Sequence, residues 1–198
     1  MDINSTFDLT GKVAIVTGGG DGIGKGCSQI LAAAGASVVV SDINIDKAQA
    51  VADSINTDGG KAIAIKCNVL EDDDIVNLVN ATVSAYGAIN IIVNNAGLGG
   101  GGRENPFKID MDYVERIYRI NVFAPFRLCQ LAVPVMEKSG YGSIVNITSM
   151  SSIDKEANMC IYASTKAALN HLASNLAYDF GPCLLYTSPS PRDAHESR

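Results

Sequence analysis

From Lys12 onward the sequence alternates short β-branched runs with stretches of helical periodicity. The runs lie at 13–17, 37–42, 62–67, 89–94 and 143–148. Each run is too continuously apolar for a half-exposed strand, so each is predicted to be buried on both faces. Strands that alternate with helices in this way build βαβ units and a parallel sheet with helices on both faces. We therefore predict one doubly wound α/β domain over residues 1–182.

Glycines fall at the predicted ends of the helices. They are Gly35 after the first helix, Gly59 and Gly60 after the second, and Gly87 after the third. Glycine is common there because it adopts the left-handed conformation that ends many helices. A fourth helix is predicted over about 110–138, where Pro125 and Pro134 either kink it or divide it. The last helix is predicted over about 160–180.

Composition excludes several classes of partner. The 198 residues carry a formal net charge of −6, whereas binding to nucleic acid needs clustered Lys and Arg. The longest apolar runs are strand-sized, so we expect no membrane-spanning segment. Residues 1–10 are polar and acidic, where a secretory signal would have a basic start and an apolar stretch. We therefore expect a cytoplasmic protein with a small-molecule substrate.

The cysteines and histidines indicate neither a metal site nor a disulfide framework. The five cysteines lie far apart, without a CxxC pair, at Cys27, Cys67, Cys129, Cys160 and Cys183. We expect them to act as small apolar residues. His171, in the middle of an amphipathic helix, is interpreted as a structural or surface residue rather than a catalytic base.

The pattern breaks after Pro182. Residues 183–193 interrupt a helical pattern and supply no strand or cap that belongs to the fold. This string resembles one translated reading frame of a sequencing-library adaptor. The alternative is a natural disordered tail, because a Ser/Pro segment without an apolar face buries too little surface to fold. On either interpretation, residues 183–198 are predicted to carry no chemistry.

A glycine-rich turn, Thr17-Gly-Gly-Gly-Asp-Gly-Ile-Gly24, joins the first strand to the first helix. Glycine lets the backbone approach a pyrophosphate closely, and the helix N-terminus offers unpaired N–H donors and a favourable dipole. Glycine-rich loops also serve as flexible turns, but the strand–turn–helix context favours binding. The predicted dinucleotide-binding residues of this turn are Gly18, Asp21, Gly22, Ile23 and Gly24.

Asp42 follows Gly24 by eighteen residues, at the end of the second strand. This spacing is close to that of the carboxylate that binds the adenosine ribose in dinucleotide folds. The carboxylate should accept from both ribose hydroxyls and repel the extra phosphate of NADP, with Asp21 adding negative charge nearby. The predicted cofactor is therefore NAD. The alternative for Asp42 is an ordinary solvated loop acid.

Tyr162 and Lys166 open the last helix, and Ser149 lies thirteen residues before the tyrosine. A spacing of four residues puts Tyr162 and Lys166 on one helical face, about 5.4 Å apart. A free phenol has a pKa of about 10, but an adjacent ammonium favours its anion. Lys166 would thus prepare Tyr162 for proton exchange with an alcohol or a ketone. Taken singly, each of these residues also has an ordinary structural explanation.

Together these residues resemble the short-chain dehydrogenase/reductase family. The resemblance covers residues 8–182 and rests on the glycine turn, Asn94-Asn95-Ala96-Gly97, Asn121, Ser149 and the Tyr162/Lys166 pair. It implies an oxidoreductase that transfers a hydride between NAD and a secondary alcohol or ketone. It also implies that Ser149 hydrogen-bonds the reacting oxygen, that Asn121 holds a water linking Lys166 to solvent, and that Lys166 contacts the nicotinamide ribose.

The resemblance also completes the expected cofactor site. Asn95 is expected first to support the turn through the backbone, while Ala96 and Gly97 let the adenosine pass closely. Asn68 and Val69 would lie beside the adenine. Asn68 stands where the family usually has aspartate, but its amide oxygen can still accept from the adenine amino group.

The implied architecture is a three-layer α/β/α Rossmann fold with strand order 3-2-1-4-5. Family members run to about 250 residues, within the range of a single domain. We therefore expect that the last two strands and the substrate-binding segment are missing, and that the chain is an inactive fragment of a homotetrameric enzyme.

Several local strings resemble bacterial hydroxysteroid dehydrogenases, which act on bile acids with NAD. They lie at 41–44, 121–123, 136–138, 147–150 and 158–159. Most of these strings are scaffold, and only 150–153, Asn158 and the Gly99–Gly102 loop lie near the reacting carbon. The expected substrate group is the 7α-hydroxyl of a bile acid or another steroid. The alternatives are a sugar, a polyol or a 3-oxoacyl thioester, or a dinucleotide-binding regulatory protein without turnover.

Overall fold

The computed structural model describes residues 7–181, so the tail at 183–198 lies outside the described residues. A five-stranded parallel sheet forms the centre, in the order β3-β2-β1-β4-β5. This order confirms the predicted topology. The strands are β1 (Val13–Thr17), β2 (Ser37–Asp42), β3 (Lys61–Lys66), β4 (Ile91–Asn94) and β5 (Ser143–Asn146).

β1 and β2 have the predicted bounds, and the ends of the other strands differ from the predicted ends by at most two residues. β4 begins two residues later than predicted, after Asn90. The side-chain oxygen of Asn90 accepts from the backbone N–H of Val13 at 2.9 Å, and its amide nitrogen donates to the hydroxyl of Ser139 at 3.0 Å. The backbone of Asn90 still donates to the carbonyl of Val13 and accepts from the N–H of Ser143, so the side chain adds to the backbone ladder at this end of the sheet.

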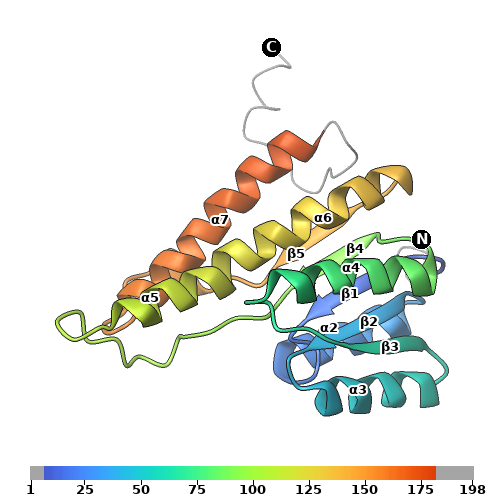
Figure 1. Ribbon diagram of the computed structural model, residues 1–198, viewed down its shortest axis with the longest axis horizontal. Helices are drawn as coiled ribbons and strands as arrows, with labels where there is room; N and C mark the ends of the chain where they lie inside the picture. The colour runs from blue at the N-terminus through green and yellow to red at the C-terminus, as the bar shows by residue number, and fades with distance from the viewer. Residues whose placement is uncertain (1–6, 182–198) are drawn as a thin grey trace.

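Helices cover both faces of the sheet (Figure 1). They are α2 (Gly22–Ala33), α3 (Ile45–Thr57), α4 (Asp72–Tyr86), α5 (Met111–Tyr118), α6 (Ala124–Lys138) and α7 (Cys160–Phe180). Alternate residues of a strand point to opposite faces. Ala14 and Val16 of β1 pack in one core with α2 and α3, whereas Ile15 packs in the other with α4 and α6. Helices thus cover both faces of the sheet, as predicted for a doubly wound fold. The prediction that every strand is buried on both faces is wrong for β5, which lies at the edge of the sheet and has Val145 45% exposed.

Most helix starts are explained by nearby polar residues. The capping residues are Asp21 for α2, Asn44 for α3 and Asp110 for α5, each of which accepts from a backbone N–H of the first turn. The first turn of α4 has three aspartates, which the helix dipole favours. α7 differs, because Met159 at its N-cap makes no side-chain capping bond and its first turn contains no acidic residue.

The predicted long helix is continuous from α5 to α6 through a π-helical turn, η1 (Arg119–Phe123). The N–H of Ala124 bonds to the carbonyl of Arg119, five residues back. Pro125 lacks an N–H, and in a regular α-helix its ring would collide with the carbonyl of Asn121. The wider turn therefore accommodates Pro125 without dividing the helix, and Pro134 lies inside α6 without ending it.

The described cysteines are all free thiols. Cys67 and Cys129 are buried, Cys27 is half-buried and Cys160 is exposed. Within residues 7–181, none of the helices has the length and hydropathy that a bilayer crossing requires.

We predict that a thiol reagent modifies Cys160 well before Cys67 and Cys129 in the folded protein. Burial raises the pKa of each buried thiol to about 11, and the thiolate is the reactive form. At about pH 8, roughly one in a thousand of these buried thiols would be ionised. Peptide mass spectrometry after timed iodoacetamide labelling measures the order, with urea-unfolded protein as the control. Equal rates at the three sites in the folded protein would contradict the packing.

Candidate active site

The residues predicted to hold a cofactor gather at the carboxyl edge of the sheet. β1 runs into the glycine turn, β2 ends at Asp42 and β4 ends at Asn94. β5 leads past the same edge to Ser149. Ligands of open parallel sheets bind outside this edge. The topology therefore brings four segments that are distant in the sequence to one place.

The glycine turn is packed too tightly for most side chains. A Cβ atom built on Gly18 would lie 2.9 Å from Nδ2 of Asn95 and 3.1 Å from Cα of Ala96. One built on Gly24 would collide with the carbonyl oxygen of Gly18. Gly22 is different, because nothing lies within 4 Å of a Cβ built there. The start of α2 is thus fixed in place and open on its outer side.

Asn95 connects the glycine turn to the turn after β4. Its amide nitrogen donates to the carbonyl oxygens of Thr17 and Gly18, each at 3.0 Å. The Thr17 hydroxyl in turn accepts from the backbone N–H groups of Asn95 and Ala96, both at 3.1 Å. The side chain of Asn95 is therefore occupied in supporting the backbone of the turn.

Asp21 does not supply the unpaired negative charge that the sequence suggested. Its Oδ2 accepts from Nζ of Lys47 at 2.7 Å, and its Oδ1 accepts from the N–H of Gly22 at 2.8 Å. The hydrogen bond from Lys47 lowers the pKa of the Asp21 carboxyl. The pair carries little net charge at neutral pH. Next to it, Ile23 is 64% exposed at the start of α2.

Asp42 is held beside the glycine turn. Its Oδ2 accepts from the N–H of Gly20 at 3.0 Å, and its Oδ1 accepts from the N–H of Asn44 at 2.9 Å. A carboxylate oxygen can accept two hydrogen bonds, so each oxygen keeps capacity for a hydroxyl. These contacts fix the position of the Asp42 carboxylate, and its binding of a ribose stays a prediction.

Asn68 is turned into its own loop. Its side-chain oxygen accepts from the N–H of Leu70 at 3.2 Å, and its backbone N–H donates to Asp74 of α4 at 2.8 Å. The oxygen expected to face an adenine thus has one lone pair in use and one left. Val69 lines a small cavity together with Thr17, so this loop reaches the same edge of the sheet.

Tyr162 and Lys166 lie close together on α7. Nζ of Lys166 is 5.8 Å from the centre of the Tyr162 ring and donates to the carbonyl of Ile147 at 2.8 Å. Lys166 is 5% exposed, and this burial lowers the pKa of its ammonium. A Cβ built on Gly97 would lie 3.5 Å from Nζ. The glycine therefore lets the turn after β4 approach the lysine.

Asn121 joins the same turn to α7 from within the π-helical turn. It is fully buried. Its side-chain oxygen accepts from the N–H of Leu98 at 2.9 Å, and its amide nitrogen donates to Leu98 and to the hydroxyl of Thr165, both at 2.9 Å. The side chain is thus occupied by protein groups next to Lys166.

Ser149 caps a short 3₁₀ turn, η2 (Met150–Ser152). Its hydroxyl accepts from the N–H of Ser151 and donates to the Ser151 hydroxyl, both at 3.2 Å. Asn170 of α7 donates to the hydroxyl of Ser152 at 2.7 Å, which holds η2 against the helix that carries Tyr162. In the part of the chain described, Ser149 and Tyr162 share no hydrogen bond.

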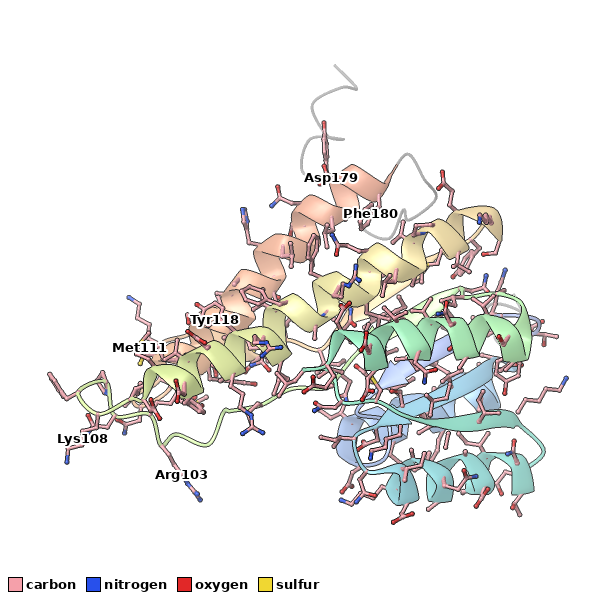
Figure 2. The ribbon with its side chains drawn as sticks, in the orientation of Figure 1. Arg103, Lys108, Met111, Tyr118, Asp179 and Phe180 are labelled. Carbon is pink, nitrogen blue, oxygen red and sulfur yellow. The ribbon has the colours of Figure 1, made fainter. Side chains whose placement is uncertain are left out.

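The loop after β4 packs on the ring of Tyr162. A Cβ built on Gly99 would lie 2.9 Å from Cδ2 of the ring, and one built on Gly100 would lie 3.1 Å from Cζ. The absence of side chains at these two glycines therefore allows the loop to contact the Tyr162 ring closely. Beside the loop is a cavity of about 580 Å³, within the size range of small-molecule sites. Arg103 and Lys108 line it and extend outward (Figure 2).

Glu104 was not among the predicted site residues, but it is buried beside Tyr162. Its carboxylate accepts from the backbone N–H groups of Ile161 and Tyr162 and from the hydroxyl of Tyr113. Lys47, the partner of Asp21, was not predicted either. No local motif signals these contacts, because the partners come from separate elements.

The fold and the matched residues define the class of protein. A family model described as short chain dehydrogenase matches residues 12–183. The chain belongs to this family of oxidoreductases.

Two relatives show which members of the family this chain is similar to. The 7α-hydroxysteroid dehydrogenase of Escherichia coli K12 is 48% identical over 173 residues, which are 87% of this chain and 67% of that protein. The cyclohexanol dehydrogenase of Acinetobacter sp. SE19 is 37% identical over 85% of this chain and 67% of that protein. The chain therefore spans about two thirds of the length of these relatives.

A solved structure supports the same comparison. It is a 7α-hydroxysteroid dehydrogenase complexed with NADH and 7-oxo glycochenodeoxycholic acid, with a TM-score of 0.88 and 45% identity. The match covers 93% of this chain and 71% of that one.

We predict that Gly24→Ala destabilises the protein, whereas Gly26→Ala in the same helix does not. A Cβ on Gly24 meets the carbonyl of Gly18 and the amide of Asn95, but one on Gly26 meets nothing within 4 Å. Overpacking of this kind costs about 1–3 kcal/mol, while alanine in place of a helical glycine contributes about 0.5–1 kcal/mol of stability. Urea unfolding measures both values. Equal destabilisation by the two variants would contradict the tight turn.

Proposed function

We propose that this protein is an NAD-dependent oxidoreductase that interconverts a secondary alcohol and a ketone. The observation that carries the proposal is the position of the Lys166 ammonium, 5.8 Å from the centre of the Tyr162 ring. The pair lies on α7, beside the turn after β4 that Asn95 connects to the glycine turn. An acid–base pair next to a dinucleotide site is the arrangement that this reaction needs.

Tyr162 is the proposed proton-transfer group. In oxidation its phenolate takes the hydroxyl proton of the alcohol, and in reduction the phenol returns a proton to the forming alkoxide. Lys166 favours the phenolate through its positive charge. The Ser149 hydroxyl, which donates to the Ser151 hydroxyl in this structure, would turn to donate a hydrogen bond to the reacting oxygen. The bound NAD supplies the nicotinamide carbon that accepts or returns the hydride.

Asn121 is proposed to serve the proton relay through its backbone. Its side chain is occupied by Leu98 and Thr165, whereas Pro125 has no N–H to offer its carbonyl oxygen. That carbonyl is therefore the proposed acceptor for a water that links Lys166 to solvent.

The residues present fit a dinucleotide. The start of α2 is open at Gly22, and both oxygens of Asp42 keep capacity for ribose hydroxyls. Lys166 has donors left for the nicotinamide ribose. The proposed cofactor-contacting set is Gly18, Asp21, Gly22, Ile23, Gly24, Asp42, Asn68, Val69, Asn95, Ala96, Gly97, Tyr162 and Lys166.

Asp42 is also the group that selects NAD over NADP in this proposal. Lys47 is paired with Asp21, so the negative charge of Asp21 contributes little. The Asp42 carboxylate has no such short ion pair among residues 7–181. It would therefore repel a 2′-phosphate.

The proposed substrate is a bile acid or a related steroid, oxidised at its 7α-hydroxyl. The 48% identity to a 7α-hydroxysteroid dehydrogenase supports this choice. A sugar, a polyol or a 3-oxoacyl thioester is the alternative. A regulatory protein without turnover is less well supported, because Tyr162 and Lys166 are both present and close together. We propose a homotetramer for the intact enzyme.

We predict that Tyr162→Phe in the intact gene product lowers kcat for alcohol oxidation by about 10²–10⁴-fold, because proton transfer loses its acceptor. The KM for NAD should change little. NADH absorbance with 7α- and 7β-hydroxy bile acids, a polyol and a 3-oxoacyl thioester measures both the rate and the preferred substrate. Tyr141→Phe, at a 38% exposed position before β5, is the control. Undiminished turnover in the Tyr162 variant would overturn the mechanism.

We predict that Asp42→Asn raises the ratio of NADP to NAD efficiency by about tenfold or more, because hydrogen bonds to a charged acceptor contribute about 1.5–3 kcal/mol. The amide keeps the shape and one acceptor, so the glycine turn should persist. The control is Asp46→Asn, an exposed acid in the first turn of α3. kcat/KM for both cofactors measures the change. An unchanged ratio would show that Asp42 does not select the cofactor.

A further inference from the structure

The helix that carries Tyr162 and Lys166 begins without a cap of its own. Met159 at the N-cap position makes no side-chain bond, and the first turn has no acidic residue. The first N–H groups of any α-helix lack partners within the helix. Leaving such groups buried and unpaired destabilises the fold. The start of α7 therefore requires an acceptor from elsewhere in the chain.

Glu104 supplies this acceptor from the loop after β4. One carboxylate oxygen accepts from the N–H of Ile161 at 2.7 Å. The N–H of Tyr162 lies 3.1 and 3.2 Å from the two oxygens and donates to both. The hydroxyl of Tyr113, on α5, donates to the carboxylate at 2.8 Å. The carboxylate thus connects α5 and α7 through three donors.

The backbone of Glu104 strengthens the same connection. Its N–H donates to the carbonyl of Asn158 at 2.9 Å. Asn158 has a φ of 58°, the left-handed region that non-glycine residues rarely adopt. Glu104 therefore binds both the turn before α7 and the first turn of α7 itself.

The environment of Glu104 separates it from its charged neighbours in the loop. Arg103 and Lys108 extend outward (Figure 2), whereas Glu104 is only 7% exposed. A buried charge is unfavourable unless it is paired or hydrogen-bonded. The three donors meet this requirement. Burial first, and the Glu104 carboxylate second, raises the pKa of Tyr113 to about 12.

We propose that Glu104 is a positioning residue for Tyr162, which it holds by capping α7 and by fixing the glycine loop that packs on the tyrosine ring. This inference rests on the proposed function of Tyr162. The carboxylate bonds the backbone N–H of that same residue, so a shift of the cap moves the phenol with it. A misplacement of about 1 Å can cost about 10²-fold in rate.

The test compares Glu104→Gln with Glu104→Asp in the intact gene product. Both variants should lower kcat with little change in the KM for NAD, because both disturb the cap. The loss should be about tenfold in the Gln variant and smaller in the Asp variant, which keeps a carboxylate to accept from the N–H groups of Ile161 and Tyr162. Glu156→Gln, at an exposed position before α7, is the matched control.

Amide hydrogen exchange provides a readout that does not depend on turnover. The amides of Ile161 and Tyr162 should exchange at least about tenfold faster in the Gln variant than in the unmodified protein. If these amides are protected in the unmodified protein but it oxidises no alcohol, the proposed function is wrong and the capping role of Glu104 stands. Unchanged kcat and unchanged amide exchange in a folded Gln variant would overturn the role of Glu104. If the Gln variant does not fold, an unchanged kcat in the Asp variant would also overturn the role of Glu104.

Discussion

The site depends on the bonds by which Thr17 and Asn95 make two separate turns into one unit. β1 and β4 are direct neighbours in the sheet, so the chain leaves both strands side by side. The Thr17 hydroxyl accepts from the backbone after β4, and the Asn95 amide donates to the backbone after β1. These bonds fix both the start of α2 and the turn after β4 that lies next to Lys166. A side chain at Gly18 would force the two turns apart.

Electrostatic pairing decides which charges at this edge remain available to a ligand. Lys47 occupies Asp21, and backbone N–H groups hold Asp42 without neutralising it. The buried ammonium of Lys166 donates to a neutral carbonyl, so its positive charge is not neutralised there and lies close to Tyr162. One carboxylate and one ammonium thus stand at opposite ends of the proposed cofactor site.

The sequence predicted the parallel sheet, its strand order and the extent of α7, because these follow from local periodicity and from a family resemblance. The spacing of Tyr162 and Lys166 likewise placed them together. What it missed are contacts between elements. Glu104 caps a helix that begins 56 residues later, and no signature within the helix points to it. The partner of Asp21 was missed for the same reason, since Lys47 belongs to the next helix.

The π-helical turn limits how the long helix can vary. Each residue of an α-helix advances the chain by about 100° around the axis, so one additional residue rotates everything that follows. At the end of α5 the hydroxyl of Tyr118, which is labelled in Figure 2, donates to the hydroxyl of Ser164 on α7 at 2.9 Å. On α6, Leu128 packs in the core. If a single residue were deleted from Arg119–Phe123, α5 and α6 would rotate relative to each other. Tyr118 and Leu128 could then no longer both keep their present contacts. Insertions and deletions are therefore more readily tolerated in the outer loops than at this point of the helix.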